Sequence, residues 1–68
     1  MNPNNKNKYE VMKDEVTIIL PVLNEEEAIL EVIDDLHLEG YKNILVVDGH
    51  SSDNTYDIVF KAGVRIIY

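Results

Sequence analysis

Three short runs of apolar, mostly β-branched residues constrain the fold of this chain most strongly. They read "VTIIL" at residues 16–20, "NILVV" at residues 43–47 and "VRIIY" at residues 64–68. Continuous runs of this kind are typical of strands buried on both faces. The segments between them are long enough for a helix, and strands joined by such crossovers pair in parallel. The sequence therefore predicts an α/β fold, a three-stranded parallel β-α-β-α-β unit.

The first connecting segment has the pattern of an amphipathic helix over residues 25–39. Four apolar residues recur at the spacing of one helical face: Ile29, Val32, Ile33 and Leu36. Asn24 is placed to cap the helix, with Glu27 three residues on as in a capping box. Gly40 supplies the left-handed residue that commonly ends a helix.

The second connecting segment predicts a polar loop followed by a short helix. Ser52 or Asp53 is placed to cap this helix, and Gly63 to end it. For Asp53 we favour this capping role over ligand binding, because its side chain can accept from the free N–H groups of the following turn. The apolar residues of the helix are Ile58, Val59 and Ala62.

The predicted sheet has two apolar faces but helices for one of them. If both crossovers are right-handed and the strands are added in one direction, both helices cover the same face. Side chains alternate between the two faces, which separates Ile18 from Ile19 and Val46 from Val47, so the face left without helices is apolar as well. Large exposed apolar patches are unusual on soluble monomers, so we expect further polypeptide, either the missing half of a larger domain or a second copy, to cover it.

Composition excludes several classes of protein. Thirteen acidic against six basic residues give a net charge of -7, the wrong sign for a chain that binds nucleic-acid phosphates by itself. There is no cysteine for disulfides, which fits a cytoplasmic protein. Residues 1–15 are expected to form a flexible polar tail, too polar for a signal peptide, before a domain at residues 16–68.

Polar segments follow the first two predicted strands, "PVLNE" and "DGHSSD". Ligands of open parallel sheets bind at the carboxyl ends of the strands, so these segments predict a crevice in which Asp48 accepts hydrogen bonds from a base or a ribose. A second interpretation is that Asp48 ties down the loop that follows it. His37 and His50 have no metal-binding spacing, and His50 is expected to be a bystander rather than a catalyst. Glycine-rich phosphate motifs of the dinucleotide-binding and P-loop types are absent.

The segments "VTIILPVLNEEEAILEVIDDL" and "ILVVDGHSSDNT" together resemble the amino-terminal part of family 2 glycosyltransferases. Within that family they are most similar to the polyprenyl-phosphate sugar synthases, the dolichol-phosphate mannose synthase group. The resemblance implies the nucleotide-binding half of a GT-A (Rossmann-like) domain. It also implies transfer of a sugar from a nucleoside diphosphate donor, a GDP- or UDP-sugar, to an acceptor such as a polyprenyl phosphate, with Mg or Mn.

The resemblance also suggests which residues bind the nucleotide. The expected set is Pro21, Val22, Leu23, Glu25, Asp48 and Gly49. Family members often carry Tyr at the position of Leu23 and a second Asp at the position of Gly49, so contacts made by those side chains differ here. The metal-binding DxD motif and the acceptor site of the family lie beyond the third strand, and no catalytic or metal-binding residue is expected in this chain.

Three functions are therefore weighed. The first is the donor-binding portion of a glycosyltransferase, expected to be inactive as an isolated chain and to meet membranes only through segments outside it. The second is a catalytically silent, truncated remnant that acts as a binding or assembly module. The third, a relative of sugar-nucleotide pyrophosphorylases, is disfavoured because no glycine-rich loop follows the first predicted strand.

Overall fold

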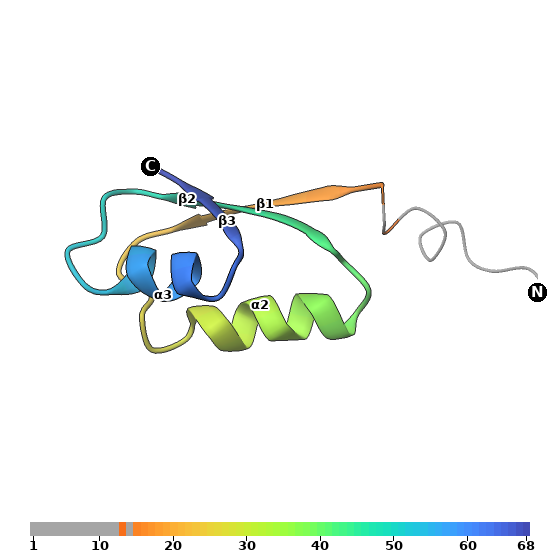
Figure 1. The fold of residues 1–68 in the computed structure, drawn as a ribbon, viewed down its shortest axis with the longest axis horizontal. Coiled ribbons are helices and arrows are strands. Elements are labelled where there is room, and N and C mark those ends of the chain that lie inside the picture. Colours follow the sequence, from red (N-terminus) through yellow and green to blue (C-terminus); the bar gives the residue numbers. More distant parts are fainter. Residues whose placement is uncertain (1–12, 14) are drawn as a thin grey trace, which may run out of the picture.

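A computed structural model describes residue 13 and residues 15–68 of the chain. The elements are β1 (Thr17–Val22), α2 (Ile29–Leu38), β2 (Asn43–Asp48), α3 (Thr55–Lys61) and β3 (Arg65–Ile67). Their order is β-α-β-α-β, as Figure 1 shows. The predicted α/β fold class is confirmed.

The three strands form one parallel sheet in the order β1-β2-β3. In its register Ile18 pairs with Ile44, and Val46 pairs with Ile66. Both helices lie on the same side of this sheet (Figure 1). This confirms the expectation that one face is covered by helices and the other is not.

The core lies between the sheet and the two helices. Its buried residues are Val22, Ile29, Ile33, Ile44, Val46 and Val59. Of the four residues predicted to form the apolar face of α2, Ile29 and Ile33 are buried and Leu36 packs against the core, whereas Val32 is 40% exposed. Ile29 and Ile33 of α2 and Val59 of α3 are therefore the buried apolar helix residues that cover the sheet.

The opposite face of the sheet is apolar and open to solvent. Ile19 is 63% exposed and Ile67 is 51% exposed, while Leu45 and Val47 between them are half-buried. These four residues occupy alternate positions along the three strands, which is why they share one face. We call this side of the sheet, onto which Thr17 also alternates, the uncovered face.

Strand boundaries differ from the prediction at Pro21. The strand was expected to stop before this residue, yet β1 continues through Pro21 to Val22. Because β1 is an edge strand, a residue without an N–H group can sit in it without breaking an inner ladder. The third strand, in contrast, is shorter than predicted and spans Arg65–Ile67.

The start of α2 is the clearest correction to the sequence prediction. Asn24 was expected to cap a helix beginning at residue 25, but α2 begins at Ile29 after a turn at residues 26–28. Asn24 has φ +52° and its side chain accepts from the Ser52 backbone N–H at 2.8 Å instead of capping. The amide oxygen of Asn24 is thus used between loops, and the prediction of a capping box at this helix was wrong.

The carboxyl-terminal ends of α2 and α3 follow the prediction. Gly40 has φ +99° and Gly63 has φ +79°, the left-handed conformation that glycine adopts most readily. After Gly40 the Tyr41 N–H donates to the Leu36 carbonyl oxygen at 3.1 Å, which closes a Schellman-type C-cap. Both glycines therefore end a helix as expected.

The predicted tail at residues 1–15 lies outside the described residues except for Lys13 and Glu15. The Lys13 ammonium donates to the Glu39 carbonyl oxygen at 2.6 Å and lies 5.3 Å from the centre of the Tyr41 ring. A lysine at this place satisfies a carbonyl oxygen at the end of α2. Lys13 therefore packs on the carboxyl-terminal end of α2.

Candidate functional site

The carboxyl ends of β1 and β2 lie side by side, as expected for neighbouring parallel strands. Val22 pairs with Asp48 in the register, and the Gly49 N–H donates to the Val22 carbonyl oxygen at 2.8 Å. This bond continues the pairing one residue past the last pair of the register. The loops at residues 23–28 and 49–54 consequently leave the sheet together and form one polar edge.

Side-chain hydrogen bonds join the two loops. The Asn24 N–H donates to the Ser51 hydroxyl oxygen at 2.8 Å, and that hydroxyl donates to Asp48 Oδ1 at 2.6 Å. In return, Asn24 Oδ1 accepts from the N–H of Ser52 at 2.8 Å. Each loop therefore supplies donors and acceptors that the other loop needs, and neither can move without breaking bonds to its partner.

Asp48 is at the centre of this edge and is almost completely buried, with 1% of its surface exposed. Its Oδ1 accepts from both the N–H and the hydroxyl of Ser51, at 2.9 and 2.6 Å. Its Oδ2 is buried and has no hydrogen-bond partner among the described residues. Asp48 thus ties down the following loop, as the second interpretation of the sequence holds, and also presents one buried acceptor that this loop does not satisfy.

A second link connects the start of the α2 turn with the start of α3. Thr55 is fully buried, and its hydroxyl oxygen accepts from the Glu25 N–H at 2.9 Å and donates to Asp53 Oδ1. Asp53 Oδ1 also accepts from the Thr55 N–H at 2.9 Å, and Oδ2 from the Glu26 N–H at 3.3 Å. The Asp53 carboxylate therefore accepts from the first residue of α3, but the predicted N-cap, Ser52 or Asp53, was wrong, because the residue at that position is Asn54.

This arrangement changes the acidity of Asp53. The hydrogen bond from the Thr55 hydroxyl holds the pKa of Asp53 below its ordinary value, against a smaller opposing effect of desolvation. Backbone N–H groups of Thr55 and Glu26 act in the same direction as the hydroxyl. A carboxylate that accepts several hydrogen bonds is stabilised in its charged form. Asp53 is consequently held as an anion between the two loops.

The six residues expected to bind a nucleotide all lie at this edge, but they differ in exposure. Leu23 is 58% exposed, and Pro21, Glu25 and Gly49 are also exposed. Val22 and Asp48 are buried beneath them. A cavity of about 230 Å³ lies beside the β1 edge, and its lining includes three of the six expected residues, Pro21, Val22 and Glu25. The other lining residues are Leu20, Ile29 and Val32.

The sequence prediction did not identify a stack of aromatic rings beside this edge. The His50 and Tyr68 rings are stacked with centroids 4.9 Å apart, and the Tyr68 and Tyr56 rings with centroids 4.5 Å apart. Phe60 extends the stack, 6.3 Å from Tyr56. The spacing of Tyr56 and Phe60, four residues apart on a predicted helix, was the one local signal for it. The contact of His50 with Tyr68 depends on the pairing of β2 with β3.

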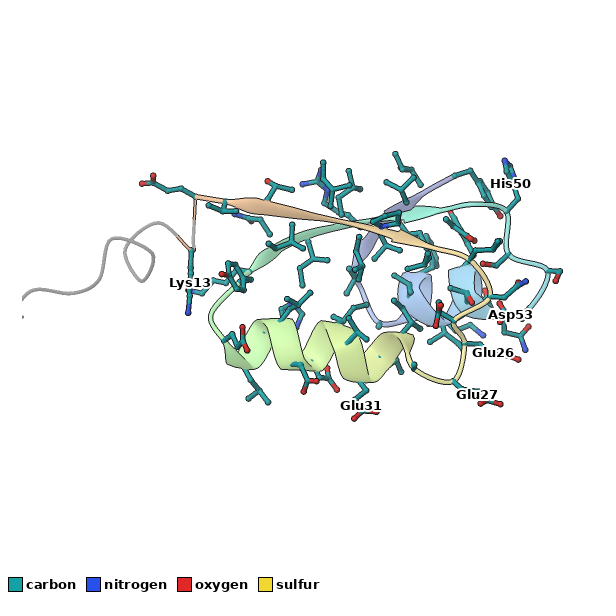
Figure 2. The ribbon with its side chains drawn as sticks, turned by 180° about the vertical axis from the view of Figure 1, so that it is seen from behind. Lys13, Glu26, Glu27, Glu31, His50 and Asp53 are labelled. Atoms are coloured by element: carbon teal, nitrogen blue, oxygen red, sulfur yellow. The ribbon has the colours of Figure 1, made fainter. Side chains whose placement is uncertain are left out.

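Within the residues that the structure describes, no group of three or more histidine, aspartate or glutamate side chains could hold a metal ion. Glu25, Glu26, Glu27 and Asp53 line one hollow, but several of their atoms already bond the loops. Figure 2 shows Glu27 pointing away from Asp53. These residues do not fit the Mg or Mn expected from the family resemblance.

No helix in the described part of the chain is long and apolar enough to cross a membrane. The longest, α2, has 10 residues, about half of what a bilayer requires.

Comparison with known proteins identifies relatives. The chain is 45% identical over 66 residues to an uncharacterized protein of Methanocaldococcus jannaschii, covering 97% of this chain and 27% of that protein. It is 43% identical over 54 residues to the glycosyltransferase AglJ of Haloferax volcanii, covering 79% of this chain and 18% of that one. No solved structure matches at a significant level.

A third relative is the UDP-N-acetylglucosamine–dolichyl-phosphate N-acetylglucosaminyltransferase of Methanococcus voltae, 43% identical over 44 residues, covering 65% of this chain and 18% of that protein. The chain thus spans about a quarter or less of the length of these relatives. The family model "Glycosyl transferase family 2" matches residues 17–68, which include all three strands, both helices and both loops of the polar edge. This chain belongs to glycosyl transferase family 2.

Proposed function

We propose that the polar edge binds the nucleoside diphosphate part of a sugar donor, and that the chain is the donor-binding portion of a glycosyltransferase. The observation that carries this proposal is the joining of the two loops, from Gly49 N–H to Val22 O and from Asn24 N–H to Ser51, into one rigid edge. Preorganised loops at the carboxyl ends of parallel strands are where such ligands bind. Membership of the family supports the same reading.

The exposed residues would contact the ligand, and the buried ones would position them. Pro21 and Leu23 offer apolar surface to a base, and the exposed backbone at Gly49 lets a ligand approach closely. We propose that Glu25, which is exposed, accepts from a ribose hydroxyl. Asp48 has a dual role in this proposal, because Oδ1 fixes Ser51 while Oδ2, which is buried and has no partner among the described residues, would accept from an N–H or O–H donor of the ligand once the side chains above it move apart.

The donor we propose is a UDP- or GDP-sugar, and the acceptor a polyprenyl phosphate. The name of the Methanococcus voltae relative specifies UDP-N-acetylglucosamine and dolichyl phosphate, which makes these the first substrates to test. Mg or Mn would need ligands from outside the described residues, so we propose that this chain alone binds a donor without transferring its sugar. With no cysteine in the sequence, we place this activity in the cytoplasm.

Calorimetric titration of the chain with UDP, GDP, UDP-N-acetylglucosamine and GDP-mannose, with and without Mn, tests the proposal. We expect saturable binding of at least one nucleotide and weaker binding by Asp48→Asn, which keeps an acceptor for Ser51 but replaces Oδ2 by an amide group. Asp57→Asn, an exposed change in α3, is the matched control and should bind as the unchanged chain does. Absence of binding for all four compounds would refute the proposed site.

The uncovered face favours a second function, that of an assembly module. Ile19 and Ile67 are more than half exposed on a face that parallel sheets normally bury. We propose that its occupant is polypeptide equivalent to the part of the longer relatives that lies outside the matched region, since the chain covers only 27% of the Methanocaldococcus jannaschii relative.

Mixing the chain with that remaining part of the archaeal relative tests the assembly proposal. We expect a one-to-one complex in sedimentation velocity, and its loss in the variant Ile19→Asp. Thr17→Asp, on the same face but replacing a polar residue, is the control. A chain that sediments as a monomer in every mixture, or that forms only dimers of itself, would contradict this choice of occupant.

A further inference from the structure

The aromatic stack defined above, His50, Tyr68, Tyr56 and Phe60, runs from the loop after β2 to the exposed side of α3. Its planes are nearly parallel, with angles of 7°, 9° and 12° between successive rings. Offset-stacked aromatic rings attract one another, which favours these orientations. The stack ends in His50 on one side and in Phe60 on the other.

The end formed by His50 lies at the polar edge. His50 follows Gly49 directly and is exposed, and Figure 2 shows its side chain projecting on the side of the sheet away from the helices. Tyr68 is the one described ring that stacks on it, so Tyr68 covers one face of an imidazole that is otherwise exposed. An exposed aromatic ring with one covered face is a platform on which another planar ring can continue the stack.

The backbone also fixes the position of His50. Its φ of +64° lies in the left-handed region, which a histidine adopts at some cost in free energy. Asp48, two residues before His50, is buried. Ser51, the residue after His50, donates two hydrogen bonds to Asp48. The imidazole is therefore presented from a short segment whose ends are anchored, rather than from a loop free to rotate.

The surface beside His50 is suited to a flat apolar group. A Cβ atom built on Gly49 would lie 3.8 Å from Leu23 Cδ1, so Leu23 borders Gly49 directly. Leu23 is 58% exposed, and Gly49, which carries no side chain, directly precedes His50. The exposed surface next to Gly49 therefore includes the isobutyl group of Leu23 and the imidazole of His50.

From these observations we infer that His50 is a specificity-determining residue, and that the nucleobase of the donor stacks on the face of its imidazole that Tyr68 does not cover, as a further ring of the aromatic stack. The inference rests on the proposed function, since it names the contact that the base makes within the same site. Stacking of this kind accepts any base, because every base has a π face. The platform thus selects for a nucleotide over a base-free sugar phosphate, and leaves the choice of base to hydrogen-bonding groups.

Two measurements on the whole 68-residue chain test the inference. The first follows the imidazole proton signals by NMR during titration with UDP, GDP and ribose 5-phosphate. The chain has two histidines, so the variant His37→Ala assigns the signals of His50. We expect upfield ring-current shifts of the His50 signals with UDP or GDP and none with ribose 5-phosphate.

The second measurement is the affinity of three variants for UDP and GDP. His50→Ala should weaken binding by about fivefold to a hundredfold, the usual effect of removing one aromatic ring from a stacked base. His50→Phe restores a ring and should recover most of the affinity. His37→Ala, a change in exposed α2 surface, should bind as the unchanged chain does.

The outcomes separate the two proposals. If a nucleotide binds but the His50 signals do not move and His50→Ala binds equally well, the stacking inference is overturned and the proposed function stands. Weak binding by both His50→Ala and His50→Phe would also overturn it, because the ring alone would not explain the affinity. If no nucleotide binds the unchanged chain, both proposals fail. Should His50→Ala lose its circular dichroism signal, the NMR shifts in the unchanged chain still decide.

Discussion

Both faces of the sheet carry large aliphatic side chains, yet these side chains have opposite environments. On the face that the helices cover, Ile44 is 4% exposed and Val46 is fully buried. On the uncovered face, Ile19 in the neighbouring strand is 63% exposed. Since these three side chains are equally apolar, the difference in their exposure comes from the position of the crossover helices, which the handedness of the connections fixes on one side.

The covered face changes its character along β2. Ile44 and Val46 are followed at the next alternate position by Asp48, which is equally buried. The burial of a carboxylate in an apolar column is costly unless hydrogen bonds compensate for lost water. Ser51 provides two such bonds on one oxygen. Ile44 and Val46 therefore stabilise the fold, whereas Asp48, at the carboxyl end of the same strand face, organises the polar edge.

The largest effect should come from a matched pair of isoleucines. Ile44→Ala removes a buried side chain and should lower the free energy of unfolding by about 2–5 kcal/mol. A chain of this size has roughly 3–10 kcal/mol in total, so this variant should be largely or partly unfolded. Ile19→Ala, the control on the uncovered face, should change it by no more than about 0.5 kcal/mol. Urea denaturation followed by circular dichroism compares them, and equal losses would mean that the uncovered face is buried in solution.

Sequence reasoning could anticipate this comparison because it depends on local periodicity. The alternation of Ile44 and Val46 against Leu45 and Val47 follows from the two-residue repeat of a strand. The single covered face follows from the order of elements and the right-handed crossover rule. Both were predictable without any knowledge of tertiary contacts.

The polar edge was predictable in place but not in its bonds. The position of Asp48 at a strand end was clear from the sequence, yet the partner of Asn24 was not. An asparagine followed by glutamates has the local signature of a capping box. In the fold, Asn24 bonds Ser52, 28 residues away, and α2 begins later. The local helix-capping propensity of Asn24 was therefore overridden by a hydrogen bond between two loops, which lie together only because β1 pairs with β2.

The second largest effect should come from Thr55, which joins the two loops of the polar edge. Thr55→Val keeps the shape of the side chain but leaves the Glu25 N–H without its acceptor and removes a donor from Asp53. Loss of a buried hydrogen-bond partner should cost about 1–3 kcal/mol of unfolding free energy. Thr17→Val, an exposed change on the uncovered face, should have almost no effect. If the two variants were equally stable, the link between the loops would contribute nothing.

Asp48 provides a smaller and more selective test. Asp48→Asn keeps an oxygen that accepts from Ser51 and removes a buried charge, so it should change the free energy of unfolding by about 1 kcal/mol or less. Asp48→Ala leaves the Ser51 N–H and hydroxyl without an acceptor and should cost more. Thermal unfolding of both variants at neutral pH measures the difference. A loss as large for Asn as for Ala would show that the charge itself, and not the acceptor for Ser51, holds the loop.

The smallest expected effect is the acid sensitivity of the link at Asp53. The Thr55 hydroxyl holds the pKa of this carboxylate below its ordinary value in the folded chain, so the folded state binds fewer protons than the unfolded state. The resulting stability is fully present above about pH 4, the usual range of an unfolded aspartate, and is lost as the pH falls through the lower folded pKa. Asp53→Asn should therefore differ most from the unchanged chain at neutral pH and least in acid, as measured by melting temperature at pH 7 and pH 3. In a Thr55→Val background the same substitution should show a weaker pH dependence, because the largest cause of the shift is gone. If the difference in melting temperature between Asp53→Asn and the unchanged chain stayed constant from pH 7 to pH 3, the negative charge of Asp53 would not contribute to joining the two loops.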